Sequence, residues 1–144
     1  MADPTHEELL AAHRTQEDTV RVVRSAIDAF NAGDTEAFLS NFTDDMHFKM
    51  NGSHGFSTPC RSKAEFVELV GRVAADLSEM ITLEILSFHP AGEWAVTETQ
   101  GTAKMTDGTP YQNVYCMLWH VKGGKIVEFK EHNDSALVEK TFFS

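Results

Sequence analysis

The sequence contains little cysteine and little positive charge. Its two cysteines, Cys60 and Cys116, lie far apart and form no CxxC pair, so it indicates neither a disulfide framework nor a thiolate metal site. Acidic residues outnumber basic residues by 22 to 12, which gives a formal net charge of −10. Because this charge repels phosphate backbones and anionic membrane surfaces, we expect neither nucleic acid nor a membrane as a partner.

Several sequence signatures are missing as well. The chain has no uninterrupted apolar run of about 18 residues, and its start, MADPTHEELLAAHRTQ, lacks a basic region followed by an apolar stretch. We therefore expect no membrane span, no export and a cytoplasmic location. The seven histidines form no HExxH pattern, which predicts no metal site. No phosphate loop or dinucleotide fingerprint is found, so we expect no cofactor.

The 144 residues, of which 42% are hydrophobic, fit one domain with a sizeable core. Helical periodicity comes first, and strand-like alternation follows it. This order predicts an α+β fold in which helices cover one face of an antiparallel sheet. We expect an N-terminal helical extension over residues 1–19 and a single domain over residues 20–144. The predicted helices cover 6–14 and 16–32 (two helices or one broken helix), 34–39 and 63–77, and the predicted strands cover 46–50, 81–88, 93–105, 110–121 and 125–133.

A pair of glycines sets the predicted register of the last two strands. If Gly123 and Gly124 are the central residues of a tight turn, counting outward places Cys116 opposite Glu131. The Asp-Gly pair at 107–108, read in the same way, aligns the preceding strand. The helix-covered face then carries the following neighbours of Glu131: Val114, Cys116, Leu118, Val127 and Phe129.

Glu131 is the carboxylate that these two hairpins direct to the helix-covered face. A carboxylate among apolar side chains is costly when charged, so its pKa tends to rise until it exchanges a proton near neutral pH, as a general acid or base requires. Alternatively, Glu131 pairs with Arg61 or Arg72, or lies in water at the open end of the sheet. The face to which Glu84 points is not fixed by counting, because the preceding turn is longer.

Three stretches of the sequence resemble the SnoaL-like, ketosteroid-isomerase-like branch of the nuclear transport factor 2 superfamily. They are AIDAFNAGDTEAFLSNFTDDMHFKMNG, RSKAEFVELV and YQNVYCMLWHVKGGKIVEFKEHNDSALV, and the resemblance covers about residues 20–140. It implies a cone-shaped domain in which helices close over a curved sheet and leave an apolar pocket. It also implies a homodimer through the outer face of the sheet, which we expect at Tyr115, Met117, Trp119 and His132.

The resemblance also suggests site residues. Steroid isomerases of this fold carry the basic aspartate where this chain has Met50, and their partner acid falls at Cys116, which argues against the steroid mechanism. SnoaL-type cyclases use an aspartate on the last strand, and Glu131 aligns with it. Asp134 is a candidate second acid, or alternatively the cap of the C-terminal segment. The expected ligand-binding residues are Phe30, Phe48, Met50, Phe66, Val114, Cys116, Leu118, Phe129 and Asn133.

These observations predict a cofactor-independent enzyme that uses Glu131 for acid/base chemistry on a small apolar carbonyl or ring compound. The reaction would be a cyclisation, an isomerisation or a hydration. The alternative is a non-catalytic protein of the same fold that binds a hydrophobic molecule or only dimerises. Met50, in place of an aspartate, favours that alternative.

Overall fold

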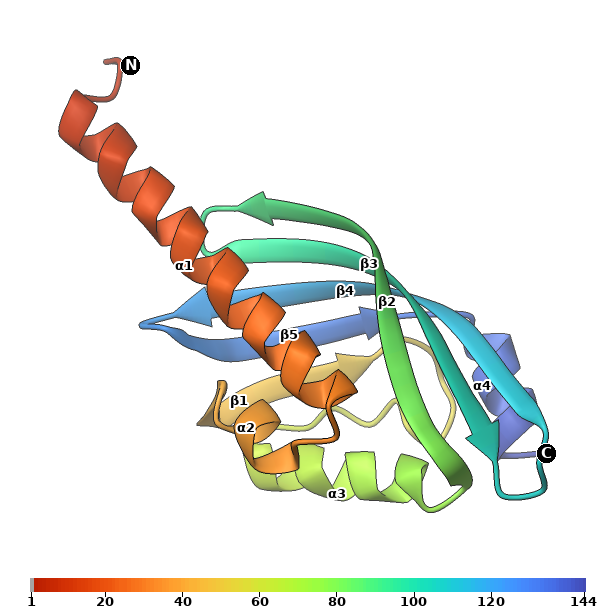
Figure 1. Ribbon diagram of the computed structural model, residues 1–144. Helices are drawn as coiled ribbons and strands as arrows, with labels where there is room; N and C mark the ends of the chain where they lie inside the picture. Colours follow the sequence, from red (N-terminus) through yellow and green to blue (C-terminus); the bar gives the residue numbers. More distant parts are fainter. Residues whose placement is uncertain (1) are drawn as a thin grey trace.

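The computed structural model describes residues 2–144 and shows helices packed against one face of a curved five-stranded sheet (Figure 1). This arrangement confirms the predicted α+β fold. The elements follow in the order α1 (His6–Asn31), α2 (Thr35–Leu39), β1 (Phe42–Met50), α3 (Lys63–Ala74), β2 (Leu77–Ala91), β3 (Trp94–Met105), β4 (Pro110–Lys122), β5 (Lys125–His132) and α4 (Ser135–Phe142).

The sheet has the strand order β1-β5-β4-β3-β2. Strands β2 to β5 pair antiparallel as a meander, whereas β1 pairs parallel with β5. The long strands β2, β3 and β4 bend strongly, and α1 lies across the concave side (Figure 1). The curved sheet and the helices together form a cone, and the first strand lies beside the last one.

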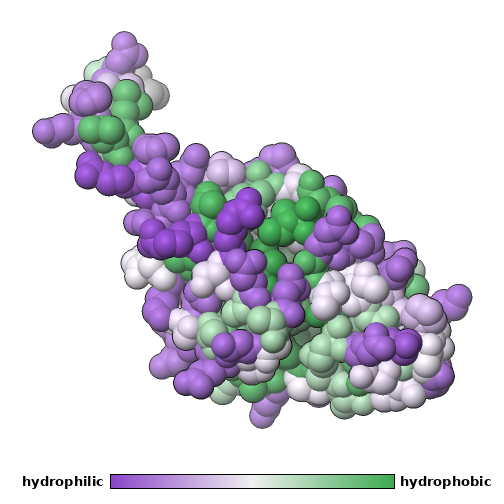
Figure 2. Space-filling view, in the orientation of Figure 1, coloured by the Kyte–Doolittle hydropathy of each residue, from purple (hydrophilic) through white to green (hydrophobic). Residues whose placement is uncertain are grey.

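Helix α1 is one continuous helix rather than two. Its start is a capping box, in which the Thr5 side chain accepts from the Glu8 backbone and the Glu8 side chain accepts from the Thr5 backbone. The break expected between residues 14 and 16 is absent, since α1 runs unbroken through Thr15. The Thr19 hydroxyl contacts the Thr15 carbonyl within the helix and the Gly92 carbonyl at 2.7 Å. The part of α1 before these contacts projects beyond the body and carries mixed polar and apolar side chains (Figures 1 and 2).

The turn between β3 and β4 is one residue longer than predicted. The Met105 amide donates to the Thr109 carbonyl at 2.8 Å, so three residues, 106–108, form the loop. Gly108 has φ +88°, which suits the last position of such a three-residue loop. The register between β3 and β4 therefore moves by one residue, and Thr99 lies opposite Tyr115 instead of Cys116.

The turn between β4 and β5 has the predicted form, but a bulge follows it. Gly123 and Gly124 have positive φ angles, and Lys122 pairs with Lys125 as expected. Val121 then pairs with Ile126, whereas His120 pairs with Glu128, so Val127 is an extra residue in β5. Beyond this bulge the register differs by one residue from the simple count.

Together these two irregularities reverse the predicted faces of β4. Three residues predicted for a dimer contact, Tyr115, Met117 and Trp119, are buried beneath the helices. Conversely, the predicted pocket residues Val114, Cys116 and Leu118 lie on the outer face, where Val114 is 45% exposed. Glu131 now lies opposite Met117. His132 is exposed as predicted, and Glu84 is also exposed.

Trp119 joins the sheet to the aromatic core. Its ring stacks on Phe129 of the neighbouring strand with centroids 4.0 Å apart, and its indole Nε1–H donates to the buried Thr97 hydroxyl at 3.0 Å. Aromatic pairs of this kind add about 0.5–1.5 kcal/mol beyond the burial of their surface. The buried indole is thus held by both stacking and a satisfied hydrogen bond.

No helix within residues 2–144 is long and apolar enough to cross a membrane.

We predict that Gly101→Ala destabilises the protein by about 2 kcal/mol, because a Cβ at this position in β3 would overlap the buried Tyr115 ring. Urea unfolding measures the change in the free energy of unfolding. Gly71→Ala in α3 is the matched control, since nothing lies near its added Cβ, and it should stabilise by about 0.5–1 kcal/mol. Equal stabilities of the two variants would contradict this packing.

Candidate functional site

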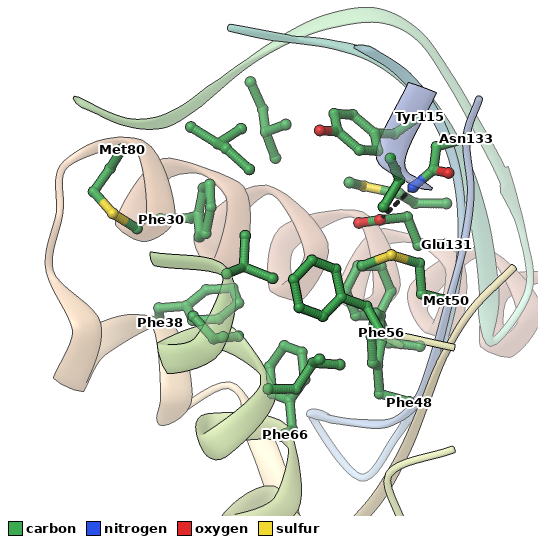
Figure 3. Close-up of a pocket in the computed structure, with 18 of the residues that line it drawn as sticks. Phe30, Phe38, Phe48, Met50, Phe56, Phe66, Met80, Tyr115, Glu131 and Asn133 are labelled. Atoms are coloured by element: carbon green, nitrogen blue, oxygen red, sulfur yellow. Dashed lines mark hydrogen bonds between the residues drawn. The ribbon is translucent and has the colours of Figure 1, made fainter. Parts of the chain in front are cut away.

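A cavity of about 110 Å³ lies between the helices and the concave face of the sheet (Figure 3). Aliphatic and aromatic side chains form almost all of its wall, and only a few polar groups face it. The apolar lining residues are Ile27, Phe30, Phe38, Phe48, Met50, Phe56, Phe66, Leu69, Val70, Val73, Leu77, Met80, Ile81, Leu83, Met117, Trp119, Phe129, Val138 and Phe142. The polar lining residues are Tyr111, Tyr115, Glu131 and Asn133.

The cavity has an open side and a closed side. Met80 lines it while remaining 51% exposed, so it lies where the cavity meets solvent. Apolar side chains gather between α1 and β2 in the space-filling view (Figure 2). Figure 3 shows Met80 and Phe30 on one side and Glu131 with Asn133 on the opposite side. A molecule entering past Met80 would therefore meet the carboxyl group at the far end.

Glu131 lies at the end of β5, where two neighbouring strands hold its backbone. It pairs with Met50 of β1 on one side and with Met117 of β4 on the other. Its carbonyl also accepts a hydrogen bond from the Asn51 amide at 2.8 Å. The strand phase that turns Phe129 inward also turns Glu131 inward, so the carboxyl group projects into the cavity (Figure 3).

The surroundings of Glu131 favour its protonated form. Burial raises the pKa of its carboxyl group from 4.5 to about 7, and a hydrogen bond from the Asn133 side chain lowers it in part. The residue as a whole is only half-buried, because part of its surface faces the cavity rather than packed protein. The carboxyl group can therefore exchange a proton near neutral pH.

The alternative in which an arginine neutralises Glu131 is wrong for this structure. Arg72 lies over the Phe56 ring, with its guanidinium carbon 5.5 Å from the ring centroid, and donates to the Gly55 carbonyl. Arg61 is exposed in the loop before α3. Within residues 2–144, Glu131 takes part in no salt bridge, and its one side-chain hydrogen bond comes from Asn133.

Tyr115 places a neutral phenol in the same cavity. Burial raises its pKa far above the usual value, and the nearby Tyr111 and Glu131 raise it further. Tyr115 therefore keeps its proton at any physiological pH and is a hydrogen-bond donor. Figure 3 shows its hydroxyl and the Glu131 carboxyl group directed into the cavity from adjacent strands.

Asp134, the predicted second acid, lies outside the cavity. It is exposed, and its side chain accepts from the Leu137 amide at 3.1 Å as the N-cap of α4. Asn113 holds the Asp134 backbone on both sides, accepting from its amide at 3.1 Å and donating to its carbonyl at 3.3 Å. The chain therefore leaves the sheet at this point, and the capping alternative is the one that the structure shows.

The structure brings seven of the predicted site residues to the cavity and leaves four outside it. Those that line it are Phe30, Phe48, Met50, Phe66, Phe129, Glu131 and Asn133. Asp134, Val114, Cys116 and Leu118 do not. The sequence reasoning missed Tyr111, Tyr115, Met117 and Trp119, because it placed β4 with the opposite face inward. Bulky side chains at every second position of β4 were the only available signal.

Within the part of the chain that the structure describes, no three histidine, cysteine or acidic side chains gather into a possible metal site.

A family model of the SnoaL-like domain matches residues 23–129. The chain belongs to the SnoaL-like domain family. The match begins inside α1 and ends at Phe129, so it includes β1 to β4 and the first part of β5 and stops before Glu131. The predicted resemblance is thereby confirmed. A comparison with curated protein sequences finds no significant match.

Solved structures of the same fold cover most of this SnoaL-like chain. An NTF2-like protein from Burkholderia pseudomallei is 18% identical, with a TM-score of 0.79, covering 88% of this chain and 98% of that one. TerC co-crystallized with polyporic acid is 18% identical, with a TM-score of 0.78 and coverages of 88% and 99%. An LEH-like epoxide hydrolase from M. tuberculosis is 16% identical, with a TM-score of 0.72 and coverages of 88% and 90%. At these identities, the likeness establishes the fold.

We predict that Glu131→Gln makes the protein more stable than the wild type at pH 8.5, by about 1–3 kcal/mol. The raised pKa means that the folded state holds the proton more tightly than the unfolded state. The stability that this proton contributes is complete below pH 4.5 and is lost as the pH rises through about 7. Glutamine is never charged, so it avoids this loss.

Urea unfolding at pH 5 and pH 8.5 measures the effect as a difference between variants. Glu98→Gln is the control, because Glu98 is exposed on the outer face of the sheet. If Glu131→Gln changes the free energy of unfolding by the same amount at both pH values, the carboxyl group is not buried as described.

Proposed function

We propose that this SnoaL-like protein catalyses cofactor-independent proton transfer on a small, uncharged ring compound that carries a carbonyl group, giving isomerisation or cyclisation. The observation that carries the proposal is a lone carboxyl group, that of Glu131, whose pKa is raised to about 7 at the end of an apolar cavity. A carboxyl group tuned to this range suits a general base or acid at neutral pH.

The lining and the volume of the cavity favour an uncharged substrate that contains about one ring. No lysine, arginine or histidine belongs to the lining contributed by residues 2–144, so a carboxylate or phosphate on the substrate would find no positive partner. The volume of about 110 Å³ approaches the roughly 150 Å³ of an apolar protein cavity that accepts benzene. The many aromatic walls offer flat surfaces for stacking.

Two groups divide the chemical work in this proposal. Glu131 removes a proton from the carbon next to the carbonyl group, and the electron pair of that C–H bond moves toward the carbonyl oxygen. The Tyr115 O–H donates a hydrogen bond to the developing negative charge, which is most effective in a site with little water. Glu131 then returns the proton to another atom of the same compound, so no redox partner is needed.

Membership in the SnoaL-like family and the structural neighbours support a small-molecule ligand. One neighbour was crystallized with polyporic acid, and another is named as an epoxide hydrolase. Folds of this shape thus hold small organic molecules. For this chain the chemistry rests on the Glu131 and Tyr115 side chains rather than on these relatives.

We predict that the protein accelerates deuterium incorporation next to the carbonyl of cyclohexanone in D₂O, as followed by NMR. Glu131→Gln should lower this rate about 10²- to 10⁴-fold, because it removes the base. Tyr115→Phe should lower it about 10²-fold, because one donor to the oxyanion is lost. Glu98→Gln, on the exposed outer face, should leave the rate unchanged.

The pH dependence of the same reaction tests the role of Glu131. A general base must be ionised, so the rate should rise with pH and reach half of its maximum near pH 7. A rate that falls above pH 7 would assign Glu131 the role of a general acid. Cyclohexanone that binds without any exchange beyond the Glu131→Gln level would instead show a non-catalytic binding protein.

We further propose that two copies associate through the outer face of the sheet. The exposed Val114 and Cys116 and the half-buried Leu118 form an apolar strip there along β4. Val114→Glu should shift the protein from dimer to monomer in sedimentation equilibrium, because it places a charge in the strip. Val67→Glu on α3 is the control, since Val67 is similarly exposed but lies away from this face. A wild-type monomer would contradict the proposal.

A further inference from the structure

Asn133 makes a hydrogen bond that is fitted to the charged form of Glu131. Its Nδ2 donates to Glu131 Oε2 at 3.0 Å across the end of the cavity (Figure 3). An ionised carboxylate only accepts hydrogen bonds, so the amide nitrogen is the correct partner for it. The amide therefore holds the carboxylate in the orientation that faces the cavity.

The other end of the same amide is unsatisfied. Asn133 Oδ1 is buried and has no hydrogen-bond partner among residues 2–144. A buried acceptor without a donor is unfavourable, and such groups in native proteins have a specific explanation. Oδ1 lies on the side of the amide away from Glu131 (Figure 3), so it can meet a donor on Glu131 only if the amide turns.

Protonation of Glu131 would create such a donor. A protonated carboxyl group carries one O–H, and an amide turned by half a rotation would accept it through Oδ1. The terminal torsion of asparagine is broad and nearly two-fold, so this rotation keeps the side chain in place. Asn113 fixes the backbone of the next residue, Asp134, so only the amide has to move.

We propose that Asn133 is the positioning residue of this site, an amide that donates to ionised Glu131 and reverses to accept from protonated Glu131. This inference rests on the proposed function, because it assigns to Glu131 two working protonation states. In each protonation state one polar atom of the amide has a hydrogen-bond partner and the other has none. The amide thus stabilises both states, so the carboxyl group stays in the same place when its charge changes.

No other polar group on the surrounding elements performs this role within residues 2–144. The titratable groups that face Glu131 are the phenols of Tyr111 and Tyr115 on β4. The walls from α1, α3, β1, β2 and α4 are apolar. His132 follows Glu131 on the opposite face of β5 and is exposed, and Asp134 caps α4.

NMR of the 144-residue protein without any ligand tests the inference. The Glu131 carboxyl carbon and the Asn133 side-chain amide are followed from pH 5 to pH 9. Both signals should titrate with one shared midpoint near pH 7. An Asn133 amide signal that stays constant while the Glu131 carbon titrates would overturn the proposal.

The variant Asn133→Leu tests the same coupling with a side chain of similar size. Asn133→Leu removes the hydrogen bond of both protonation states, but the bond to the ionised carboxylate is the stronger of the two. The Glu131 midpoint should therefore rise by about one pH unit, a roughly tenfold tighter proton. Asn51→Leu is the control, because Asn51 touches Glu131 through its backbone amide alone. An Asn133→Leu midpoint equal to that of the control would overturn the proposal. If this variant does not fold, the wild-type titration alone decides.

These measurements are independent of turnover. Coupled titration in a protein that exchanges no cyclohexanone protons would retain the positioning role and reject the proposed catalysis. If the protein catalyses exchange but the Asn133 amide signal does not change when Glu131 titrates, only the positioning role is rejected. In an active protein, Asn133→Leu should also move the midpoint of the pH–rate profile upward, which a purely structural role would not do.

Discussion

The transfer of one carboxyl group into an apolar cavity is the constraint on which the rest of this structure depends. Glu131 is costly there when ionised, and no cation among residues 2–144 compensates for it. The structure instead holds the backbone of Glu131 between two strands, supplies one amide donor from Asn133 and surrounds the remainder with apolar side chains and two neutral tyrosines. A cationic partner would be a simpler way to stabilise a carboxylate, but it would also remove the proton affinity near neutral pH.

Much of this arrangement follows from local sequence chemistry. The Thr5–Glu8 capping box begins α1, and the change from helical to alternating periodicity separates the helices from the strands. Glu131 shares its strand face with Phe129, since the two are separated by one residue and no irregularity lies between them. Within a short regular strand, the face to which each side chain points can therefore be read directly from the sequence. The inward direction of Glu131 was predicted correctly for this reason.

The phase of β4 could not be read in the same way, because it depends on two backbone irregularities. The Asp-Gly sequence at 107–108 fits a two-residue turn as well as the three-residue loop that forms. The bulge at Val127 has no composition signal, since Ile126 and Val127 suit any strand. Together the two shifts move β5 by two residues relative to β3, which leaves the faces of β5 as predicted and inverts only β4. That strand carries apolar residues on both faces, so the bulkier side chains at every second position were a weak signal and Tyr115 was assigned to the wrong side.

The two tryptophans occupy different environments, so their fluorescence can distinguish the inside of the cone from the outside. Trp119 is buried, lines the cavity and stacks on Phe129, so its emission should respond when a guest displaces solvent from the interior. Trp94 is half-buried, stacks on His120 with ring centroids 4.3 Å apart and does not line the cavity, so a guest should leave its emission unchanged. The cone therefore contains an intrinsic fluorophore inside and a second one outside, and occupancy can be read optically without a label.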